Sequence, residues 1–316
     1  MYRGDIMSDK TATVTIVGSY NVGLTMNIPR FPTEGETVTA QNFSEGPGGK
    51  GSNQAVAAAR LGANTSFIGK VGEDQYGDDA IKLLKSENID ITHTAQVAET
   101  HTGVAFILVN EDGDNEITVA PVANNALDSD VVQSADDVIR NSDCLLLQFE
   151  VLDPPLITAA QIAADADVPV VLNPAPAREI PPSLVSNVDY LTPNESEALT
   201  LLDKDLKDKT NHERLGKELL GLGFESVIIT QGSSGALLVS HNDSLSVAAP
   251  SVPVADTTGA GDAFNGALAV ALGEGRPIED ATQFACRAGA LEVTKQEVIP
   301  GLPDRTSIQS ISEYSD

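Results

Sequence analysis

The sequence predicts an α/β fold with three layers, in which a central, mostly parallel sheet lies between helices and carries a small β-sheet lid. Two observations support this prediction. Short apolar runs typical of buried strands alternate with helix-like segments, and such alternation favours a parallel sheet covered on both faces. Two further stretches, 27–43 and 102–121, break the alternation with a β-rich pattern and are the expected source of the lid.

The expected elements follow one another along the chain. Residues 13–17 (Thr-Val-Thr-Ile-Val) predict a buried strand that ends at Gly18. Residues 51–61, rich in small side chains, predict a helix closed by Gly62. The remaining elements are a strand over 65–71, an amphipathic helix over 78–87, and short strands over 144–149, 168–172, 190–192 and 227–230.

The second β-rich stretch predicts a hairpin, because two apolar runs flank the turn Asn-Glu-Asp-Gly-Asp-Asn. We expect one domain over residues 11–316, with the lid formed by inserts at about 24–46 and 100–123. A flexible, polar leader is expected over residues 1–10. Exposed sheet faces often pair with a second copy, which predicts a homodimer formed through the lid.

The charge of the chain excludes some partners. The sequence of 316 residues is 41% hydrophobic and only 4% aromatic, which predicts an aliphatic core. It has 46 acidic and 19 basic residues, and the net charge of −27 would repel nucleic-acid phosphates and anionic lipid. Such self-repulsion is tolerated best where salt screens it, which predicts a cytoplasmic protein of a high-salt-adapted cell.

The cysteine pattern agrees with a reducing compartment. Cys144 and Cys286 lie in apolar contexts and are expected to be small buried side chains. We find no disulfide framework, metal-ligand spacing or signal peptide in the sequence. No apolar run approaches the roughly 20 residues that span a bilayer.

The most informative segment is 256–266, which reads Asp-Thr-Thr-Gly-Ala-Gly-Asp-Ala-Phe-Asn-Gly and leads into an alanine-rich helix. Gly259, Ala260 and Gly261 leave backbone N–H groups bare at the helix start, where they and the helix dipole form an anion hole. Asp262 beside this hole fits a base that takes a proton from a hydroxyl while the hole holds the transferred phosphoryl group. The alternative is that Asp262 only stabilises the first helical turn.

A second glycine-rich segment, 46–54, reads Gly-Pro-Gly-Gly-Lys-Gly-Ser-Asn-Gln. It is not a P-loop, because Gly51 follows Lys50 where that motif needs Ser or Thr. The glycines bring the backbone close to a small polar ligand, and Asn53 has both donors and acceptors for sugar hydroxyls. The alternative is a tight loop without a ligand.

Together these two segments resemble the two signatures of the ribokinase-like (PfkB) carbohydrate kinase family, through 48–55 and 256–262. The resemblance covers roughly residues 12–305, with matching segments at 18–21, 31–37, 173–179 and 193–197. The run Asn-Pro-Ala-Pro-Ala-Arg at 173–178 is most similar to the ribokinases. The resemblance implies a ribokinase-like fold and an ATP-dependent sugar kinase that uses Mg²⁺ and phosphorylates a primary hydroxyl of a ribose-type sugar.

The resemblance also implies roles for individual residues. Asp262 would be the base, and the amides of Gly259, Ala260 and Gly261 would form the anion hole. Positions that would contact the sugar are Asn21, Gly23, Gly49, Lys50, Asn53 and Glu150. Positions that would lie by the nucleotide are Asn194, Thr230 and Gly232, with Gly259 and Gly261. Glu197 would hold Mg²⁺ through water together with Asn194, although Asn-x-x-Glu is also a helix capping box. For Lys50 the alternative is a solvated surface lysine.

This chain departs from the family's pattern at the end of the first strand. Ribokinases usually have Asn-x-Asp there, with the Asp on two sugar hydroxyls, and this chain has Asn21-Val22-Gly23. Loss of that acceptor removes hydrogen bonds of about 1.5–3 kcal/mol each. The alternative substrate is therefore ribose 1-phosphate, whose phosphate Lys50 or Arg178 would pair with. A third hypothesis is a nucleoside kinase. The non-enzymatic alternative is a sensor that binds a sugar or nucleotide without catalysis.

A second departure concerns the family's monovalent-cation loop, where this chain has Glu297, Val298 and Gly301. Asp256 and Thr258 remain as candidate K⁺ ligands.

Overall fold

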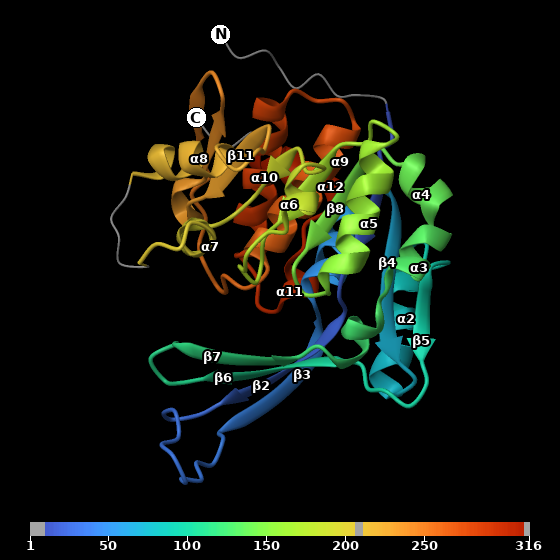
Figure 1. Cartoon of the computed structure of the whole chain (residues 1–316). Coiled ribbons are helices and arrows are strands. Elements are labelled where there is room, and N and C mark those ends of the chain that lie inside the picture. Colours follow the sequence, from blue (N-terminus) through green and yellow to red (C-terminus); the bar gives the residue numbers. More distant parts are fainter. Residues whose placement is uncertain (1–9, 206–210, 313–316) are drawn as a thin grey trace.

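The computed structural model describes residues 10–205 and 211–312 (Figure 1). Its main sheet has seven parallel strands: β1 (Thr13–Val17), β4 (Asn64–Gly72), β5 (Thr94–Val97), β8 (Cys144–Gln148), β9 (Val170–Asn173), β10 (Tyr190–Leu191) and β11 (Ser226–Thr230). Two antiparallel strands, β12 (Ala236–Ser240) and β13 (Ser244–Val247), extend one edge. The order across the sheet is β13-β12-β11-β10-β9-β8-β1-β4-β5, which confirms the expected mostly parallel sheet.

Helices cover both faces of this sheet. One face carries α1 (Lys50–Arg60), α2 (Gln75–Ser86), α9 (Ala260–Gly273), α10 (Ile278–Glu292), α11 (Val298–Gly301) and α12 (Arg305–Ser312). The other face carries α3 (Ser129–Ser134), α4 (Asp136–Arg140), α5 (Asp153–Ala164), α6 (Pro182–Val185), α7 (Glu195–Leu201) and α8 (His212–Leu220). Two short 3₁₀ helices are η1 (Val122–Ala126) and η2 (Gly232–Ser234). The three-layer prediction is therefore confirmed.

The central strands are apolar because both of their faces are buried. All five residues of β8, Cys-Leu-Leu-Leu-Gln, are buried, and its neighbour β1 is buried at four of its five positions. A strand covered on two sides gains stability from a continuous apolar run rather than from alternation. Two aliphatic clusters result, one on each face, and Cys144 lies buried in one of them.

Small residues let α1 and α9 approach closely. A side chain at Gly266 of α9 would lie 2.7 Å from the Ala57 Cβ and 2.9 Å from the Gln54 carbonyl oxygen of α1. Close helix packing at this point brings the glycine-rich segment at the start of α1 next to the start of α9. The two segments singled out in the sequence thus meet because their helices pack side by side.

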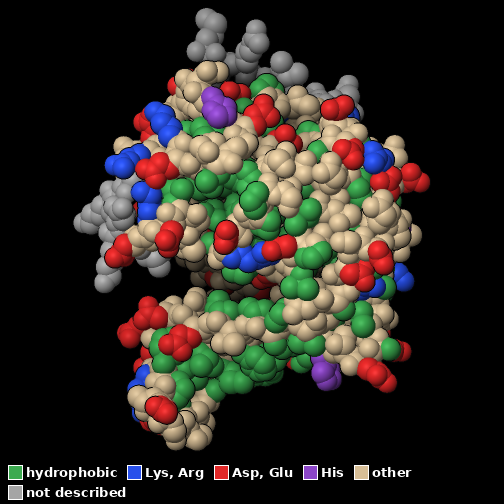
Figure 2. All heavy atoms as spheres, viewed as in Figure 1, with side chains coloured by type: hydrophobic (Ala, Val, Ile, Leu, Met, Phe, Trp, Pro, Cys, Tyr) green, Lys and Arg blue, Asp and Glu red, His purple; other side chains and the backbone are tan. Residues whose placement is uncertain are grey.

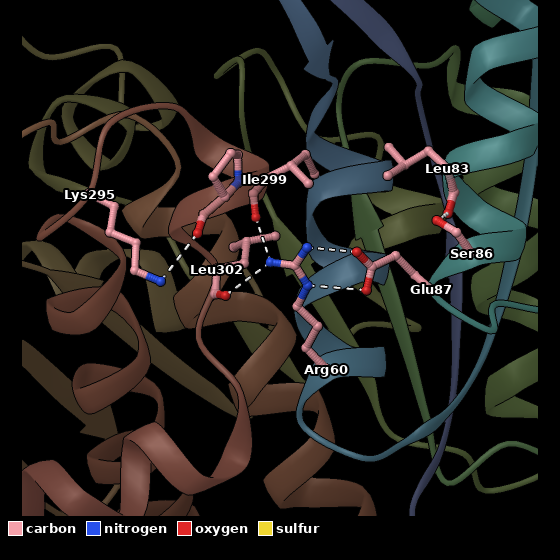
Figure 3. A network of polar contacts seen from close by, with 8 residues as sticks. Arg60, Leu83, Ser86, Glu87, Lys295, Ile299 and Leu302 are labelled. Atoms are coloured by element: carbon pink, nitrogen blue, oxygen red, sulfur yellow. Dashed lines mark hydrogen bonds and ion pairs between the residues drawn. The ribbon is translucent and has the colours of Figure 1, made fainter.

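Hydrogen bonds of the Arg60 side chain hold the end of α1 against α2 and α11 (Figure 3). The Arg60 guanidinium donates to both carboxylate oxygens of Glu87, at 3.1 and 2.6 Å. It also donates to the carbonyl oxygens of Ile299, at 2.6 Å, and Leu302, at 3.1 Å. Charge-assisted bonds of this kind fix the turn at α11, and Val298 of that turn packs against the loop that begins α9.

The lid is a separate four-stranded sheet below the main body in Figure 1. Its strands are β2 (Asn21–Asn27), β3 (Asn42–Gly48), β6 (Gly103–Val109) and β7 (Asn115–Ala120), in the order β3-β2-β6-β7. The hairpin expected over 103–120 is confirmed, with Gly113 at a φ of 84° in the turn.

The expectation that 27–43 forms strands is wrong for most of that stretch. The lid strands β2 and β3 lie at its two ends, and residues 28–41 form a loop. Pro29 and Pro32 lack the N–H groups that a strand ladder needs, and Glu36 accepts from Arg30 and from the Thr33 N–H instead. The helix expected to begin at 78 begins at Gln75, because the Asp74 side chain caps it by accepting from Gly77 N.

Other expectations concern the chain ends and membranes. The leader expected over 1–10 lies, except for Lys10, outside the described residues. Among the described residues no helix is long and apolar enough to cross a bilayer.

Candidate active site

Asp262 lies in the first turn of α9, at the point where the main body faces the lid. The view in Figure 2 shows the molecule hollowed between these two parts. Asp262 is buried, with 6% of its surface exposed. Its carboxylate accepts from Asn53 Nδ2 at 2.8 Å and from Gln54 Nε2 at 3.0 Å. Asp262 therefore has the fixed orientation that a general base requires.

The charge state of Asp262 follows from opposing effects. Burial raises the pKa of Asp262 above its usual value, and Lys50 together with the Asn53 and Gln54 hydrogen bonds acts against this rise. The Lys50 ammonium is near three carboxylates, those of Asp262, Glu150 and Glu197. Burial alone would lower the pKa of Lys50, but these carboxylates raise it above its usual value. Lys50 is half-buried and near these carboxylates, which favours a charged partner within the site over the alternative of a solvated surface lysine.

The backbone at the start of α9 has the form expected for an anion hole. Gly259 is the N-cap residue, with φ 92° and ψ −12° in the left-handed region that favours glycine. A side chain there would lie 2.5 Å from Val298 Cγ1, so the turn at α11 supports the loop from behind. The first N–H groups of a helix have no intrahelical partner, and those of Gly259, Ala260 and Gly261 belong to this turn.

Glu150 organises the opposite side of Asp262, next to the lid. It follows β8, and its Oε2 accepts from Ser19 Oγ at 2.5 Å, from Asn21 Nδ2 at 3.2 Å and from Lys50 N at 2.9 Å. Asn21 begins the lid strand β2 and also accepts from Asn124 Nδ2 at 2.9 Å. These contacts tie the lid to the main body at the place where the sequence predicts sugar contacts.

Gly49 and Gly23 differ in how much space surrounds them for a side chain. Gly49 has a φ of 94°, and a side chain there would lie 2.6 Å from the Asn21 backbone nitrogen. Gly23 in β2 has room, because an added Cβ would be no nearer than 3.7 Å to the Gly46 oxygen and Ile107 Cδ1. Gly49 is therefore required by the close approach of two backbones, whereas Gly23 leaves open space on the lid.

A separate cavity of about 750 Å³ has none of the expected sugar-contact residues in its lining. Its lining combines the start of α7 with the turn after β11: Asn194, Glu195, Ser196, Leu199, His212, Thr230, Gln231, Gly232 and Ser234. Thr230 and Gly232, expected by the nucleotide, thus line one cavity with Asn194. The volume suits a ligand of the size of a nucleotide.

Asn194 and Glu197 form the capping box predicted from their spacing. Asn194 Oδ1 accepts from Glu197 N at 2.8 Å, and Glu197 Oε2 accepts from Asn194 N at 2.8 Å. Burial raises the pKa of Glu197, against opposing effects from Asn194 N and Lys50. The capping box uses only Oε2 of Glu197, so the other carboxylate oxygen could contact a water of a hydrated Mg²⁺, an ion that usually keeps several waters in such sites. Among the described residues no three Asp, Glu, His or Cys side chains gather as a ready-made metal site.

The candidate K⁺ ligands lie in the loop before α9. Asp256 Oδ1 accepts from Thr258 N at 2.9 Å, and Asp256 N donates to the Val293 carbonyl at 3.3 Å. Glu292 of α10 is 1% exposed, and neither of its carboxylate oxygens has a hydrogen-bond partner among the described residues. Burial, with further contributions from Asp256 and Asp262, raises the pKa of Glu292 to about 8. Sequence reasoning missed Glu292, because an acidic residue on a helix usually faces solvent.

Arg178, a candidate partner for a sugar phosphate, is already engaged. Its guanidinium forms an ion pair with Asp153 and donates to the Val151 carbonyl at 3.1 Å. It also lies 4.1 Å from the centroid of the Phe149 ring.

The chain matches known proteins over nearly all of its length. The model of the pfkB family carbohydrate kinases matches residues 11–305. A ribokinase of Haemophilus influenzae is 39% identical over 303 residues, which cover 96% of this chain and 99% of that protein. A ribokinase of Bacillus subtilis is 38% identical over 300 residues, covering 94% and 98%. The structure of an Arabidopsis thaliana ribokinase complexed with ribose and ATP has a TM-score of 0.90 at 32% identity, covering 97% of this chain and 100% of that one.

Proposed function

The chain belongs to the pfkB family of carbohydrate kinases, and from this premise we propose that it is an ATP-dependent ribose kinase. It transfers the γ-phosphoryl group to the primary hydroxyl of the sugar. The observation that carries this proposal is the place of Asp262, which is buried beside an anion hole in a protein that offers two ligand regions. The lid and Glu150 border one region, and the cavity of about 750 Å³ forms the other.

In the proposed mechanism, Asp262 takes the proton of the sugar hydroxyl as that oxygen attacks phosphorus. Asn53 and Gln54 orient the carboxylate, and Lys50 favours its charged form. The N–H groups of the 259–261 turn stabilise the negative charge on the transferred group. When bound, Mg²⁺ neutralises phosphate charge. Asn194 and Glu197 would hold its hydration shell beside the cavity.

For the sugar, we propose contacts from Asn21, Gly49, Asn53 and Glu150, with Gly23 facing the substrate through its backbone only. The nucleotide lies along Thr230, Gly232 and Asn194. Two observations support unphosphorylated ribose over ribose 1-phosphate. Lys50 is near three carboxylates, and Arg178 is paired with Asp153, so neither cation is available for a second phosphate. The glycine at position 23 then only removes one hydrogen-bond acceptor for the sugar, and the open space beside it is not an anion site.

The test is ADP formation in high salt with ribose, ribose 1-phosphate, fructose, 2-keto-3-deoxygluconate and nucleosides as acceptors. We expect turnover with ribose to exceed turnover with all the others. Preference for ribose 1-phosphate or for a nucleoside would contradict the assignment. ATP and sugar binding without ADP formation would point to a sensor.

We also propose that a monovalent cation such as K⁺ binds at the loop of Asp256 and Thr258. The buried Glu292 carboxylate, which lacks a hydrogen-bond partner among the described residues, supports this, because a buried charge needs a partner. Melting temperature and turnover in KCl and in choline chloride of equal concentration test it. Equal values in the two salts would exclude a specific site.

Finally, we propose a cytoplasmic homodimer adapted to high salt. The lid exposes large apolar side chains, with Phe43 at 53%, Phe106 at 46% and Ile117 at 53% exposure, and these suit a second copy. Figure 2 shows the hydrophobic side chains gathered on the lid. The net charge of −27 suits a medium of high ionic strength. Sedimentation of the wild type and of a Phe106→Ser variant tests the homodimer, and melting temperatures over a range of KCl concentrations test the salt adaptation. A wild-type monomer, or stability that falls with KCl, would contradict them.

A further inference from the structure

A chain of hydrogen bonds leads away from Asp262 into the protein interior. Gln54, in the first turns of α1, donates from Nε2 to Asp262 Oδ1 at 3.0 Å and to Asn173 Oδ1 at 3.1 Å. Asn173 ends β9, and its Nδ2 donates to the Thr192 carbonyl, just after β10, at 3.4 Å. Three elements of the main body are therefore linked to the candidate base.

The chain of bonds then returns to the helix on which it began. The Thr192 hydroxyl donates to Asn265 Oδ1 at 2.6 Å. Asn265 Nδ2 in turn donates to the Gly261 carbonyl at 2.8 Å. Since Gly261 precedes Asp262, the bonds close a ring that joins the base to the turn of the anion hole through β9, β10 and α1. We call Asp262, Gln54, Asn173, Thr192 and Asn265 the polar ring.

The polar ring is shielded from water. Gln54 and Asn265 are 0% exposed, Thr192 is 1% exposed, and Asn173 and Asp262 are each 6% exposed. Within the ring, Gln54 Oε1 is buried without a hydrogen-bond partner among the described residues. The remaining bonds hold the side chains in one arrangement, because another arrangement would leave further donors or acceptors unpaired. The two oxygens of the Asp262 carboxylate have different donors, because Oδ2 accepts from Asn53 and Oδ1 accepts from Gln54.

We propose that Gln54 is a positioning residue, which uses the polar ring to hold the Asp262 carboxylate in a fixed geometry relative to the anion hole. The inference rests on the proposed function, because it assigns Asp262 as the base. Gln54 differs from Asn53 because the Nε2 group of Gln54 donates to both Asp262 and Asn173 inside the protein. Its effect on the reaction is therefore indirect, and misplacement of a reacting group by about 1 Å can reduce the rate by about 100-fold.

Kinetics of three variants test the positioning role. Gln54→Leu keeps the size of the side chain but removes the donor, and we expect kcat to fall by about 100-fold with little change in the KM for ATP. Thr192→Val opens the ring at its far side, and we expect a fall of about tenfold. The matched control is Thr282→Val in α10, which also removes a hydroxyl that is 0% exposed and that donates to a carbonyl, that of Ile278. Its kcat should equal that of the wild type.

The pH profile adds a readout that a loss of stability does not move. Gln54 donates to the charged form of Asp262, so its removal raises the pKa of the base and shifts the acid limb of kcat/KM to higher pH. The charged groups that act on Asp262, namely Lys50, Glu150, Glu197 and Glu292, are the same in wild type and variant. An unshifted acid limb, or a Thr192→Val kcat equal to that of Thr282→Val, would overturn the proposal.

A measurement without substrate separates this proposal from the assigned reaction. Asp262→Asn removes a buried charge, and we expect the substitution to raise the melting temperature more in the Gln54→Leu background, where the carboxylate has lost a donor. Equal shifts in both backgrounds would show that Gln54 and Asp262 are not coupled and would overturn the ring. Absence of ribose phosphorylation by the wild type, with unequal shifts, would refute the proposed function and leave the ring in place.

Discussion

In the region proposed for the sugar, which we call the sugar side, the protein's own side chains are hydrogen-bonded to one another. Glu150 accepts from Ser19, Asn21 and Lys50, and Ser19 and Asn21 are 0% and 3% exposed. On the nucleotide side, Asn194 and Gly232 are exposed and line an open cavity with the turn after β11. The sugar side is thus preorganised by charged and amide side chains, whereas the nucleotide side offers backbone and helix-start groups.

This difference has a physical consequence for binding. A preorganised set of side chains rejects a ligand that leaves its buried polar groups unpaired, so the sugar side should determine specificity. Exposed groups around an open cavity contribute little each, so the nucleotide side should tolerate single changes. The predictions below test this contrast, beginning with Asp262.

The largest effect is expected for Asp262→Asn. An amide cannot accept the hydroxyl proton, and general-base catalysis contributes about 10²–10⁴-fold, so kcat should fall by about 10³-fold. The affinity for ADP, measured by calorimetry, should change little, because Asp262 does not line the cavity proposed for the nucleotide. Turnover close to that of the wild type would show that Asp262 only stabilises the helix start.

A smaller but specific effect is expected for Glu150→Gln. The amide keeps the size of the side chain but loses the charge that binds Ser19, Asn21 and the Lys50 N–H. Hydrogen bonds to a charged group contribute about 1.5–3 kcal/mol each, so kcat/KM for ribose should fall by about 10- to 100-fold. The KM for ATP should stay the same.

Glu179→Gln is the control for that variant, because this exposed carboxylate lies close to Arg178 in the chain and makes none of those contacts. Its kinetics should equal those of the wild type. Equal losses for ribose and ATP in Glu150→Gln would contradict the division between the two sides.

On the nucleotide side, Asn194→Ala should have only a modest effect on binding. It removes a cavity group and the N-cap of α7, whose loss typically lowers stability by about 1 kcal/mol. We expect the KM for ATP to rise by about fivefold, which corresponds to one neutral hydrogen bond. Asn211→Ala, which removes the N-cap of α8 and does not line this cavity, should lower the melting temperature similarly without changing the KM.

The sequence predicted the parts of this architecture that have a local physical cause. Strands β1 and β11 are apolar because they are buried, and the N-cap glycine of α9 and the capping box of α7 follow from helix-end chemistry. The lid strand β3 was not predicted over its full range, since its sequence Asn-Phe-Ser-Glu-Gly-Pro-Gly is mostly exposed and has no apolar alternation.

The members of the polar ring were missed for a different reason. Thr192 and Asn265 are ordinary residues just after a strand and in a helix, and only the packing of α9 against the sheet brings the Thr192 hydroxyl within 2.6 Å of Asn265. Their role depends on long-range contacts, which no local pattern records. Glu292 belongs to the same class, because its burial depends on how α10, α11 and the loop before α9 come together.

The smallest effect on turnover is expected for Glu292→Gln, which changes stability through pH. The pKa of Glu292 is about 8 in the folded protein, against a usual value of 4.5. Between these values the folded state holds a proton that the unfolded chain releases, so stability falls as pH rises through this window. A neutral amide of the same size removes that dependence. In choline chloride, the melting temperatures of the variant and the wild type should be similar near pH 5. At pH 8 the melting temperature of the variant should be about 5 °C higher than that of the wild type.

Melting curves at both pH values, repeated in KCl, complete this test. Parallel curves for wild type and variant in choline chloride would show that Glu292 does not titrate in this range. If a cation binds near Asp256, KCl should stabilise the wild type at pH 8 and narrow its gap to the variant, because the cation then offsets the charge that burial leaves without a partner. An unchanged gap would place the cation away from Glu292, and this residue at the end of α10 would then be an uncompensated carboxylate at high pH.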